Sequence, residues 1–365
     1  PLSAKPFPYR ITAEMPERQQ VHLDLLHIAT GQPIAAAPPV VLRETVMPPL
    51  GLGVSPDTPT AGLGEAIRRL APAFTALEID LLRDPRLAEA RLLLAAIPGA
   101  LRLDIRKASP EAVLGAVQTL EPLLGGREVI GVSLWDADEA LVAAARALLR
   151  GLRIGSGTGA FFTELNRGTD WPAGADYLSW TSNPTVHGSS DDTLGESVEP
   201  LDDILRTAKA KWPGRRFQLG PHTLGMRFNP NATTAEGRSR TASPDPRQGQ
   251  SIAAAWMLGM FAGYADDAVE TISFFEAEGP RGLVGSDGGM TAAGDLFTKL
   301  AAPRGAPVAV LTWAGQPRLR GLRVDGRAGR SYCIANLHHE TTELLLPDGG
   351  HHRLGGFDTL WLGAS

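Results

Sequence analysis

The chain has 365 residues, which is enough for a large barrel with an accessory domain. Apolar residues make up 43% of it and charged residues 21%, as in ordinary soluble proteins, and no apolar run reaches the length of about 18 residues needed to span a membrane. The net charge is −5 with both signs mixed along the chain, which argues against the clustered Lys and Arg of a nucleic-acid or membrane-surface partner.

The first 47 residues are predicted to be a β-rich segment that leads out of an N-terminal β domain, with one strand in the run QQVHLDLLHI. From residue 48 onward, short apolar runs of β character alternate with amphipathic helical stretches that carry apolar residues at i, i+3, i+4 and i+7. Ser109 followed by Pro110 is a typical helix start. The predicted strands cover residues 50–55, 76–82, 100–106, 129–135, 152–157, 176–182, 216–222 and 271–278.

Eight strands alternating with helices predict an α/β fold, a (β/α)8 TIM barrel over residues 48–304. The competing fold is an open doubly wound sheet, whose first turn should carry a phosphate-binding G-x-G-x-x-G. The first turn here reads GLGVSPD and does not fit that fingerprint. Short strands separated by Gly, Pro and Asp turns follow in residues 305–365 and predict a small C-terminal antiparallel β domain, β-sandwich-like in character.

Cysteine content and chain ends give three further expectations. The single cysteine excludes an intrachain disulfide and a Cys-based zinc site. Because Cys333 lies in the apolar run SYCIANL, we expect it to be buried as a small hydrophobic residue. No signal peptide is recognised, so a cytoplasmic location is the default expectation.

Polar residues collect where the predicted strands end, which in this fold is the end that carries active sites. After the first four strands they are Asp57, Asp80, Arg83, Asp104, Arg106, Trp135 and Asp136. After the last four they are Glu164, Asn166, Arg167, Asn183, His187, Asp191, Asp192, His222, Thr223, Arg227, Asn229, Asn231, Glu276, Glu278 and Arg281. The second half is richer in Asn, His, Arg and Glu, which predicts a crevice walled by strands five to eight.

Glu164 and Glu276 are the natural catalytic pair, because each follows a Phe-rich apolar stretch that would desolvate it. Two carboxylates in different surroundings can divide the work of a general acid and a general base. A structural alternative stays open for each glutamate. Glu276 would form a rim salt bridge with Arg281, and Glu164 would form an i, i+3 ion pair with Arg167.

Several other candidates also keep two interpretations. His187 either contacts a substrate or braces its loop. Asp192 either contacts a substrate or caps a helix. Arg227 either contacts a substrate or is held by the carbonyls of its own loop. The spacing of His187 and Asp191 is too loose for a metal site. The run GSGTG at 155–159 lacks the Gly-Lys-Ser/Thr ending of a phosphate loop, so neither a metal nor a cofactor is predicted.

Five ordered segments resemble the D-apionate lactonase family: FFTELNR, NPTVHGSSDDTLGES, HTLGMRFNPNAT, DPRQGQSIAAAWMLG and ISFFEAEGPRGL. These enzymes act in the bacterial catabolism of the branched sugar apiose and hydrolyse the lactone of D-apionate to the open acid. The resemblance implies a glycoside-hydrolase-like build of a β-rich N-terminal domain, a TIM barrel and a β-rich C-terminal domain. It covers residues 48–290 and extends weakly into the last domain.

The chain departs from the family pattern at residues expected to line the pocket. It reads NRGTDWP where the pattern has Asn-Arg-Pro-Pro, and Thr185 stands where the pattern has Gln. It reads GSSDD in place of Ala-Phe-Asp-Asp, and GMRF in place of Arg-Pro-Arg-Phe, so one basic residue is missing. A related member with another lactone or a glycoside as substrate therefore stays open.

The resemblance implies a hydrolase of a sugar lactone, in which Glu276 is the general base and Glu164 the general acid. A retaining glycoside hydrolase with Glu276 as nucleophile and Glu164 as acid/base is the first alternative, and a catalytically silent carbohydrate-binding protein is the second. The expected partner is a small sugar lactone or glycoside, and the sequence does not fix the oligomeric state. The expected substrate contacts are Asn166, Arg167, Asn183, His187, Asp192, His222, Arg227, Asn229 and Arg281.

Overall fold

The structure is a computed structural model that describes residues 37–106, 108–168, 171–186, 188–227, 229, 234, 237, 244–346 and 349–363. The strand expected in QQVHLDLLHI and the candidate His187 lie outside these residues. The chain divides into the units Pro1–Ala35 and Ala36–Ser365. All that follows concerns the second unit.

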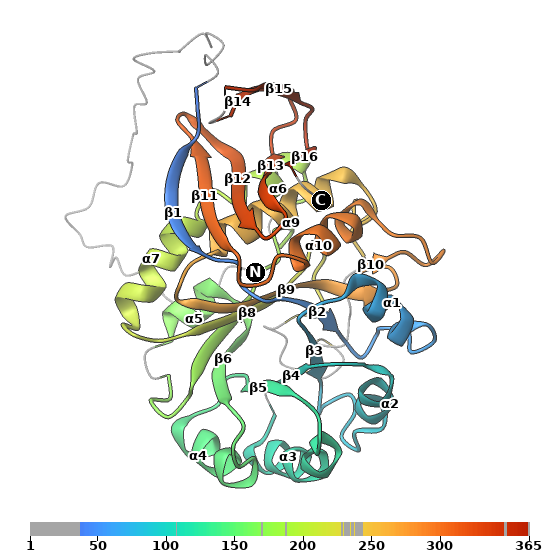
Figure 1. The fold of residues 1–365 in the computed structure, drawn as a ribbon. Coiled ribbons are helices and arrows are strands. Elements are labelled where there is room, and N and C mark those ends of the chain that lie inside the picture. Colours follow the sequence, from blue (N-terminus) through green and yellow to red (C-terminus); the bar gives the residue numbers. More distant parts are fainter. Residues whose placement is uncertain are drawn as a thin grey trace, which may run out of the picture. The chain divides into compact units, whose positions relative to one another are not determined.

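Eight parallel strands form a barrel, because β9 pairs with β8 on one side and with β2 on the other and so closes the sheet (Figure 1). This closure confirms the predicted (β/α)8 fold and excludes the open doubly wound sheet. Each of the eight predicted barrel strands is present with bounds shifted by a few residues, and β10 (Gly282–Val284) pairs in parallel with the end of β9. The barrel strands are β2 (Leu50–Val54), β3 (Phe74–Ile79), β4 (Leu101–Ile105), β5 (Val129–Leu134), β6 (Ile154–Phe161), β7 (Tyr177–Thr181), β8 (Phe217–His222) and β9 (Val269–Glu278).

Helices follow the barrel strands, and their starts obey the signals in the sequence. The Ser109 hydroxyl accepts a hydrogen bond from the Ala112 amide and Pro110 opens α3, as predicted. Among the described residues, no helix combines the length and the apolar character needed to cross a bilayer. The helices are α1 (Leu63–Leu70), α2 (Ala88–Ala96), α3 (Pro110–Leu124), α4 (Glu139–Leu148), α5 (Phe162–Arg167), α6 (Asp191–Glu196), α7 (Leu201–Lys211), α9 (Ser251–Tyr264) and α10 (Ala292–Ala301).

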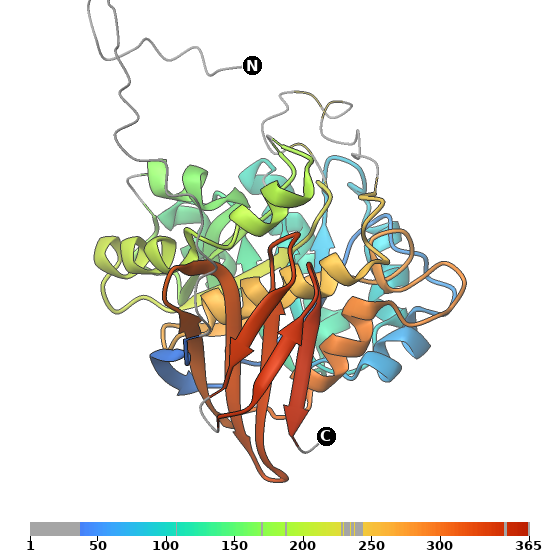
Figure 2. The same ribbon diagram turned by 90° about the horizontal axis from the view of Figure 1, so that it is seen from above.

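A five-stranded antiparallel sheet lies on the outer side of α9 (Figure 2). Because this helix is covered by the barrel on one side and by the sheet on the other, every residue from Ile252 to Tyr264 is buried. A separate hairpin, β14 (Thr342–Leu345) with β15 (His351–Leu354), completes the C-terminal part. The order of the sheet is β1 (Val40–Val46), β11 (Pro307–Trp313), β12 (Gln316–Gly326), β13 (Gly329–Asn336) and β16 (Thr359–Gly363).

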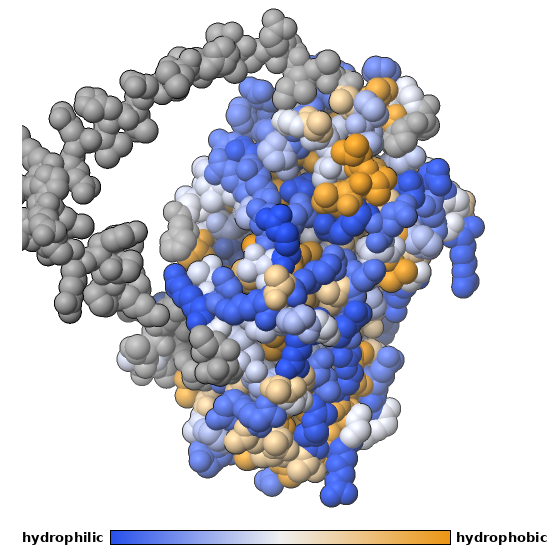
Figure 3. All heavy atoms as spheres, turned by 90° about the vertical axis from the view of Figure 1, so that its left-hand side faces the viewer, coloured by the Kyte–Doolittle hydropathy of each residue, from blue (hydrophilic) through white to orange (hydrophobic). Residues whose placement is uncertain are grey.

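The edge strand β1 comes from the segment before the barrel, yet it pairs with β11. The division of the chain at residues 47 and 304 stays a prediction, and this pairing adds 40–46 to the C-terminal sheet. Four apolar side chains of β1 are exposed, and Figure 3 shows small apolar groups among polar ones on the face where β1 lies. Cys333 on β13 is completely buried, as predicted, and burial raises the pKa of its thiol above the usual range.

Glycines on β6 make room for two aromatic rings of neighbouring strands. A Cβ atom at Gly155 would lie 2.1 Å from the ring of Tyr177, and one at Gly159 would lie 2.3 Å from the ring of Trp135. No larger residue fits at either position without moving a packed ring. The run GSGTG is therefore a barrel strand, in agreement with its poor match to a phosphate loop.

Candidate active site

The carboxyl ends of the barrel strands carry a series of eight alternating charges, which we call the charge chain. Four of its members are arginines and four are carboxylates, and Arg83 at one end also forms an ion pair with Glu89. Neighbouring members form ion pairs, and the link between Glu276 and Arg227 is the attraction between their opposite charges. In order, the members are Arg83, Asp57, Arg281, Glu276, Arg227, Glu78, Arg106 and Asp80.

Glu276 lies at the centre of this chain and is 2% exposed. Its Oε1 accepts hydrogen bonds from the Ser55 hydroxyl at 2.7 Å and from Nε of Arg281 at 3.0 Å. The neighbouring Phe275 has a positive φ of 45°, and the register of β9 against β2 jumps by one residue at this point. This bulge turns Glu276 toward Ser55 at the end of β2. The ion pair with Arg281, which the sequence left open, is present inside the site.

Arg227 and Glu78 form the next ion pair of the charge chain, and both side chains are buried. Burial lowers the pKa of Arg227 to about 10, and the charge of Glu276 partly offsets this effect. Burial likewise lowers the pKa of Arg106 to about 10, with Asp80 as the main opposing charge. Both guanidinium groups therefore remain cations at neutral pH.

Sequence reasoning did not single out Glu78. It lies within the apolar run ALEIDLL, where it reads as part of a strand. The signal that would have found it is the alternation of Glu78 and Asp80 with Leu77 and Ile79, which places both acids on one face of β3. That face points into the barrel, where Glu78 meets Arg106 of the next strand.

A small cleft lies beside the charge chain at the ends of β6, β7 and β8. Its lining includes Phe161, Ser182, Asn183, Thr223 and Arg227. Oδ1 of Asn183 accepts a hydrogen bond from the amide of the residue two positions on, at 2.8 Å. Its Nδ2 is buried, and no acceptor for it is found among the described residues. The cleft has a volume of about 10 Å³, so its hydroxyl and amide groups offer contacts to a single polar group of a ligand.

Glu164 lies one turn beyond this cleft, on α5. Its side chain is 29% exposed, and Arg167 lies 3.7 Å away, so the predicted i, i+3 ion pair is present at long range. Within the part of the chain that the structure describes, no group donates a hydrogen bond to the buried Oε2 of Glu164. Asn166 and Arg167 are exposed, and Lys211 at the end of α7 donates to both the carbonyl and the side chain of Asn166.

The remaining candidates are distributed more widely. The capping interpretation of Asp192 is wrong, because Ser190 caps α6 and Asp192 interacts instead with Arg318 of β12 at 3.4 Å. Asn229 is exposed. The structure thus brings Glu276, Arg281, Arg227 and Asn183 together, and places Asn166, Arg167 and Asp192 elsewhere on the surface. The functional roles of all these residues stay predictions.

His222 at the end of β8 is completely buried. Its ring stacks on Tyr264, with 5.2 Å between the ring centroids, and Phe274 lies on its other side at 5.4 Å. No described residue forms a hydrogen bond with either ring nitrogen. Burial, assisted by the charge of Arg102, lowers the pKa of this imidazole from 6.5 to about 3. The role of His222 in substrate binding stays a prediction.

This lowered pKa predicts a pH-dependent stability that the variant His222→Phe should lack. The unfolded chain binds a proton at His222 below pH 6.5, and the folded chain does so only near pH 3, so the wild type loses stability as the pH falls through this window. The loss amounts to at most about 1.4 kcal/mol for each pH unit. Urea unfolding of both proteins at several pH values between 7 and about 4 measures this difference, and parallel stability curves would contradict it.

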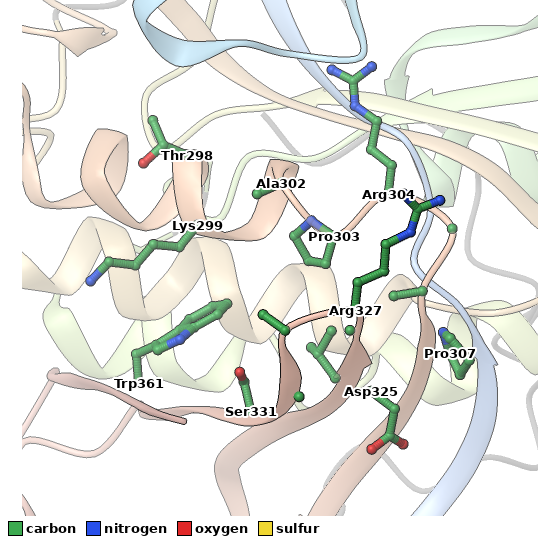
Figure 4. Close-up of a pocket in the computed structure, with 16 residues that line it drawn as sticks. Thr298, Lys299, Ala302, Pro303, Arg304, Pro307, Asp325, Arg327, Ser331 and Trp361 are labelled. Carbon is green, nitrogen blue, oxygen red and sulfur yellow. The ribbon is translucent and has the colours of Figure 1, made fainter. Parts of the chain in front are cut away.

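A larger hollow of about 850 Å³ lies between the end of α10 and the β12–β13 hairpin (Figure 4). Its charged residues are the cations Lys299, Arg304 and Arg327, together with Asp325, which is itself ion-paired with two arginines. The loop that borders it hydrogen-bonds to Met47, just before β2, so the hollow lies toward the amino ends of the strands. It lacks an available carboxylate for acid–base chemistry. No group of three His, Cys, Asp or Glu side chains within the described ranges could hold a metal ion.

Solved structures resemble the chain in fold. A GH30 endoxylanase from Clostridium papyrosolvens has a TM-score of 0.54 at 8% identity and covers 88% of this chain and 97% of its own. A glycoside hydrolase family 30 subfamily 8 xylanase from Clostridium acetobutylicum has a TM-score of 0.52 at 8% identity, covering 89% and 96%. A 4-O-α-L-rhamnosyl-β-D-glucuronidase from Fusarium oxysporum has a TM-score of 0.51 at 10% identity, covering 85% and 83%. At such low identity these likenesses show the fold alone.

Sequence comparison identifies the barrel more closely. Residues 135–306 match the family model described as D-apionate lactonase, TIM barrel domain. A D-apionate lactonase from Brucella anthropi is 26% identical over 347 residues, an alignment that covers 81% of this chain and 55% of that protein. The chain therefore spans about half the length of the curated relative it matches. The resemblance predicted from the ordered motifs is confirmed, because residues 135–306 match this family model and the chain is similar to the Brucella anthropi D-apionate lactonase.

Proposed function

We propose that this chain carries the catalytic barrel of a sugar-lactone hydrolase that converts D-apionolactone to D-apionate. One observation supports the proposal: the buried cation Arg227 lines a cleft with hydroxyl and amide groups, and its charge interacts with that of the buried carboxylate Glu276. A small-molecule substrate and a cytoplasmic location, both expected from the sequence, belong to the same proposal.

The proposed reaction uses three side chains. Glu276 accepts a proton from a water molecule as the water oxygen attacks the lactone carbonyl. The guanidinium of Arg227 stabilises the negative charge that develops on the carbonyl oxygen in the tetrahedral intermediate. When the bond from the carbonyl carbon to the ring oxygen breaks, Glu164 donates the proton that the leaving hydroxyl group requires. The product is the open acid.

The surroundings of the two glutamates support this division of work. Glu276 is enclosed and receives hydrogen bonds from a serine hydroxyl and an arginine, which compensate a buried negative charge. Glu164 is partly exposed, its arginine is distant, and its Oε2 has no hydrogen-bond donor among the described residues. The two carboxylates therefore differ in burial and in hydrogen-bond partners, which suits a division of work between a base and an acid.

The test is an assay of the purified chain on D-apionolactone, on other sugar lactones and on a panel of aryl glycosides. We expect hydrolysis of a lactone, and we expect Glu164→Gln to lower kcat by about 100-fold while Glu199→Gln, on the surface near the C-terminal sheet, leaves it unchanged. Hydrolysis of glycosides in place of lactones would favour the retaining-glycosidase alternative. Binding of sugars without turnover would favour the carbohydrate-binding alternative.

A further inference from the structure

Arg227 links the charge chain to the cleft. Among the described residues, it is the one member of the charge chain that also lines the cleft at the ends of β6, β7 and β8. Its side chain is 5% exposed and pairs with Glu78, and its ring neighbour is Trp135 with 6.0 Å between the guanidinium carbon and the ring centroid. The orientation of this guanidinium therefore depends on what holds Glu78.

Glu78 is itself held in place by a second arginine, Arg106. It is 1% exposed, and its Oε1 accepts a hydrogen bond from Nε of Arg106 at 2.5 Å. Nη1 of Arg106 in turn donates to Asp80 at 2.6 Å. One carboxylate thus pairs with two buried cations, one directly after β4 and one in the loop after β8, and it cannot turn away from both without leaving Arg106 partly uncompensated.

We infer that Glu78 is a positioning residue for the proposed lactone hydrolysis, because it holds the Arg227 guanidinium at the cleft where that group stabilises the oxyanion. The inference rests on the proposed function and adds a residue that the sequence motifs do not contain. Glu78 does not touch the substrate and acts through Arg227.

Electrostatics explain why a neutral residue cannot replace Glu78. Arg227 interacts with a second acid, Glu276, on the other side. If the charge of Glu78 is removed, the ion pair with Glu78 no longer opposes the attraction of the buried guanidinium to Glu276. Arg227 would then shift toward the proposed base, and the oxyanion would lose its cation. The expected defect therefore lies in the chemical step more than in substrate binding.

The first test compares two isosteric variants of buried acids. We expect Glu78→Gln to lower kcat for the lactone by about 100-fold with KM changed by only a few-fold, as when one oxyanion donor is lost. Glu78→Asp should keep more activity than Glu78→Gln, because it keeps the charge. The matched control is Asp84→Asn, since Asp84 is also a buried acid after β3 but bonds only to backbone amides of α2.

Chemical rescue separates positioning from general structural support. In Arg227→Ala, added guanidinium ion at concentrations too low to unfold the protein should occupy the vacated place beside Glu78 and restore part of kcat. In the double variant Arg227→Ala with Glu78→Gln, the same ion should restore nothing. Urea unfolding of every variant checks that the folded fraction is comparable.

The possible outcomes distinguish the inference from the function beneath it. If the wild type hydrolyses a lactone and Glu78→Gln matches Asp84→Asn in kcat, Glu78 is not a positioning residue and the proposed function stands. Rescue by guanidinium that is independent of Glu78 would overturn the inference in the same way. If the wild type hydrolyses no lactone at all, the proposed function fails and the inference fails with it.

Discussion

Replacing Glu276 by Gln is expected to lower kcat/KM for the lactone by about 1,000-fold or more. The amide has nearly the shape of the carboxylate and can still accept hydrogen bonds from Ser55 and Arg281 at Oε1. It cannot take up a proton from the attacking water. The loss should therefore appear in kcat, and steady-state kinetics with direct detection of the product acid measures it.

The same strand supplies a matched control. Glu270 lies near the amino end of β9 and is also paired with arginines, Arg153 at 2.7 Å and Arg216 at 3.2 Å. Glu270→Gln breaks comparable ion pairs at the opposite end of the barrel. We expect this variant to keep kcat within a few-fold of the wild type. Equal losses in Glu276→Gln and Glu270→Gln would mean that the site depends on strand stability and not on a base at position 276.

Local patterns predicted the barrel well because its elements are local. Alternation of short β runs with amphipathic helices, and caps such as Ser109, are properties of neighbouring residues. The pairing of β1 with β11 joins residues about 270 positions apart, and such non-local contacts leave no mark in a short window of sequence. The strand was therefore assigned to a leading segment and not to the C-terminal sheet.

The site was predictable in part for the same reason. Glu276 lies near the end of β9, and Arg227 and Arg281 lie in the loops after β8 and β9, so counting polar residues at and after strand ends found them. Glu78 lies one position before the end of β3, and its partner Arg227 comes 149 positions later in the chain, so neither the role nor the pairing can be read from a motif. The bulge at Phe275 could not be predicted from the sequence either, although it turns the side chain of residue 276 toward β2.

Counting polar residues after each strand also did not predict where around the barrel the charged side chains gather. The cleft lies at the ends of β6, β7 and β8, within the strands five to eight where the crevice was expected, whereas the charge chain runs from the loops after β2, β3 and β4 to β9. Closure of the barrel explains this difference, because the eighth strand lies directly beside the first. Acids and arginines from opposite halves of the sequence therefore lie side by side where β9 pairs with β2.

The largest effect on stability is expected from Asp104→Asn, which should lower the free energy of unfolding by about 3–5 kcal/mol. Arg102 and Asp104 are neighbours on β4 and both are 0% exposed. Nε of Arg102 donates to Asp104 at 2.9 Å, and Nη2 donates to it at 2.8 Å. Without the carboxylate charge, a cation enclosed in the barrel interior keeps only carbonyl and hydroxyl partners. Urea unfolding at pH 7 measures the loss.

Two controls show whether burial is the cause. Asp203→Asn breaks an ion pair with Arg206 that is exposed on the surface of α7, and it should cost less than about 0.5 kcal/mol. The double variant Arg102→Met with Asp104→Leu removes both buried charges and should regain more than half of the stability that Asp104→Asn loses. If Asp104→Asn costs no more than Asp203→Asn, the carbonyl of Gly220, 2.8 Å from Nη2 of Arg102, must carry most of the compensation. The low dielectric of the barrel interior would then matter less than the hydrogen bonds that line it.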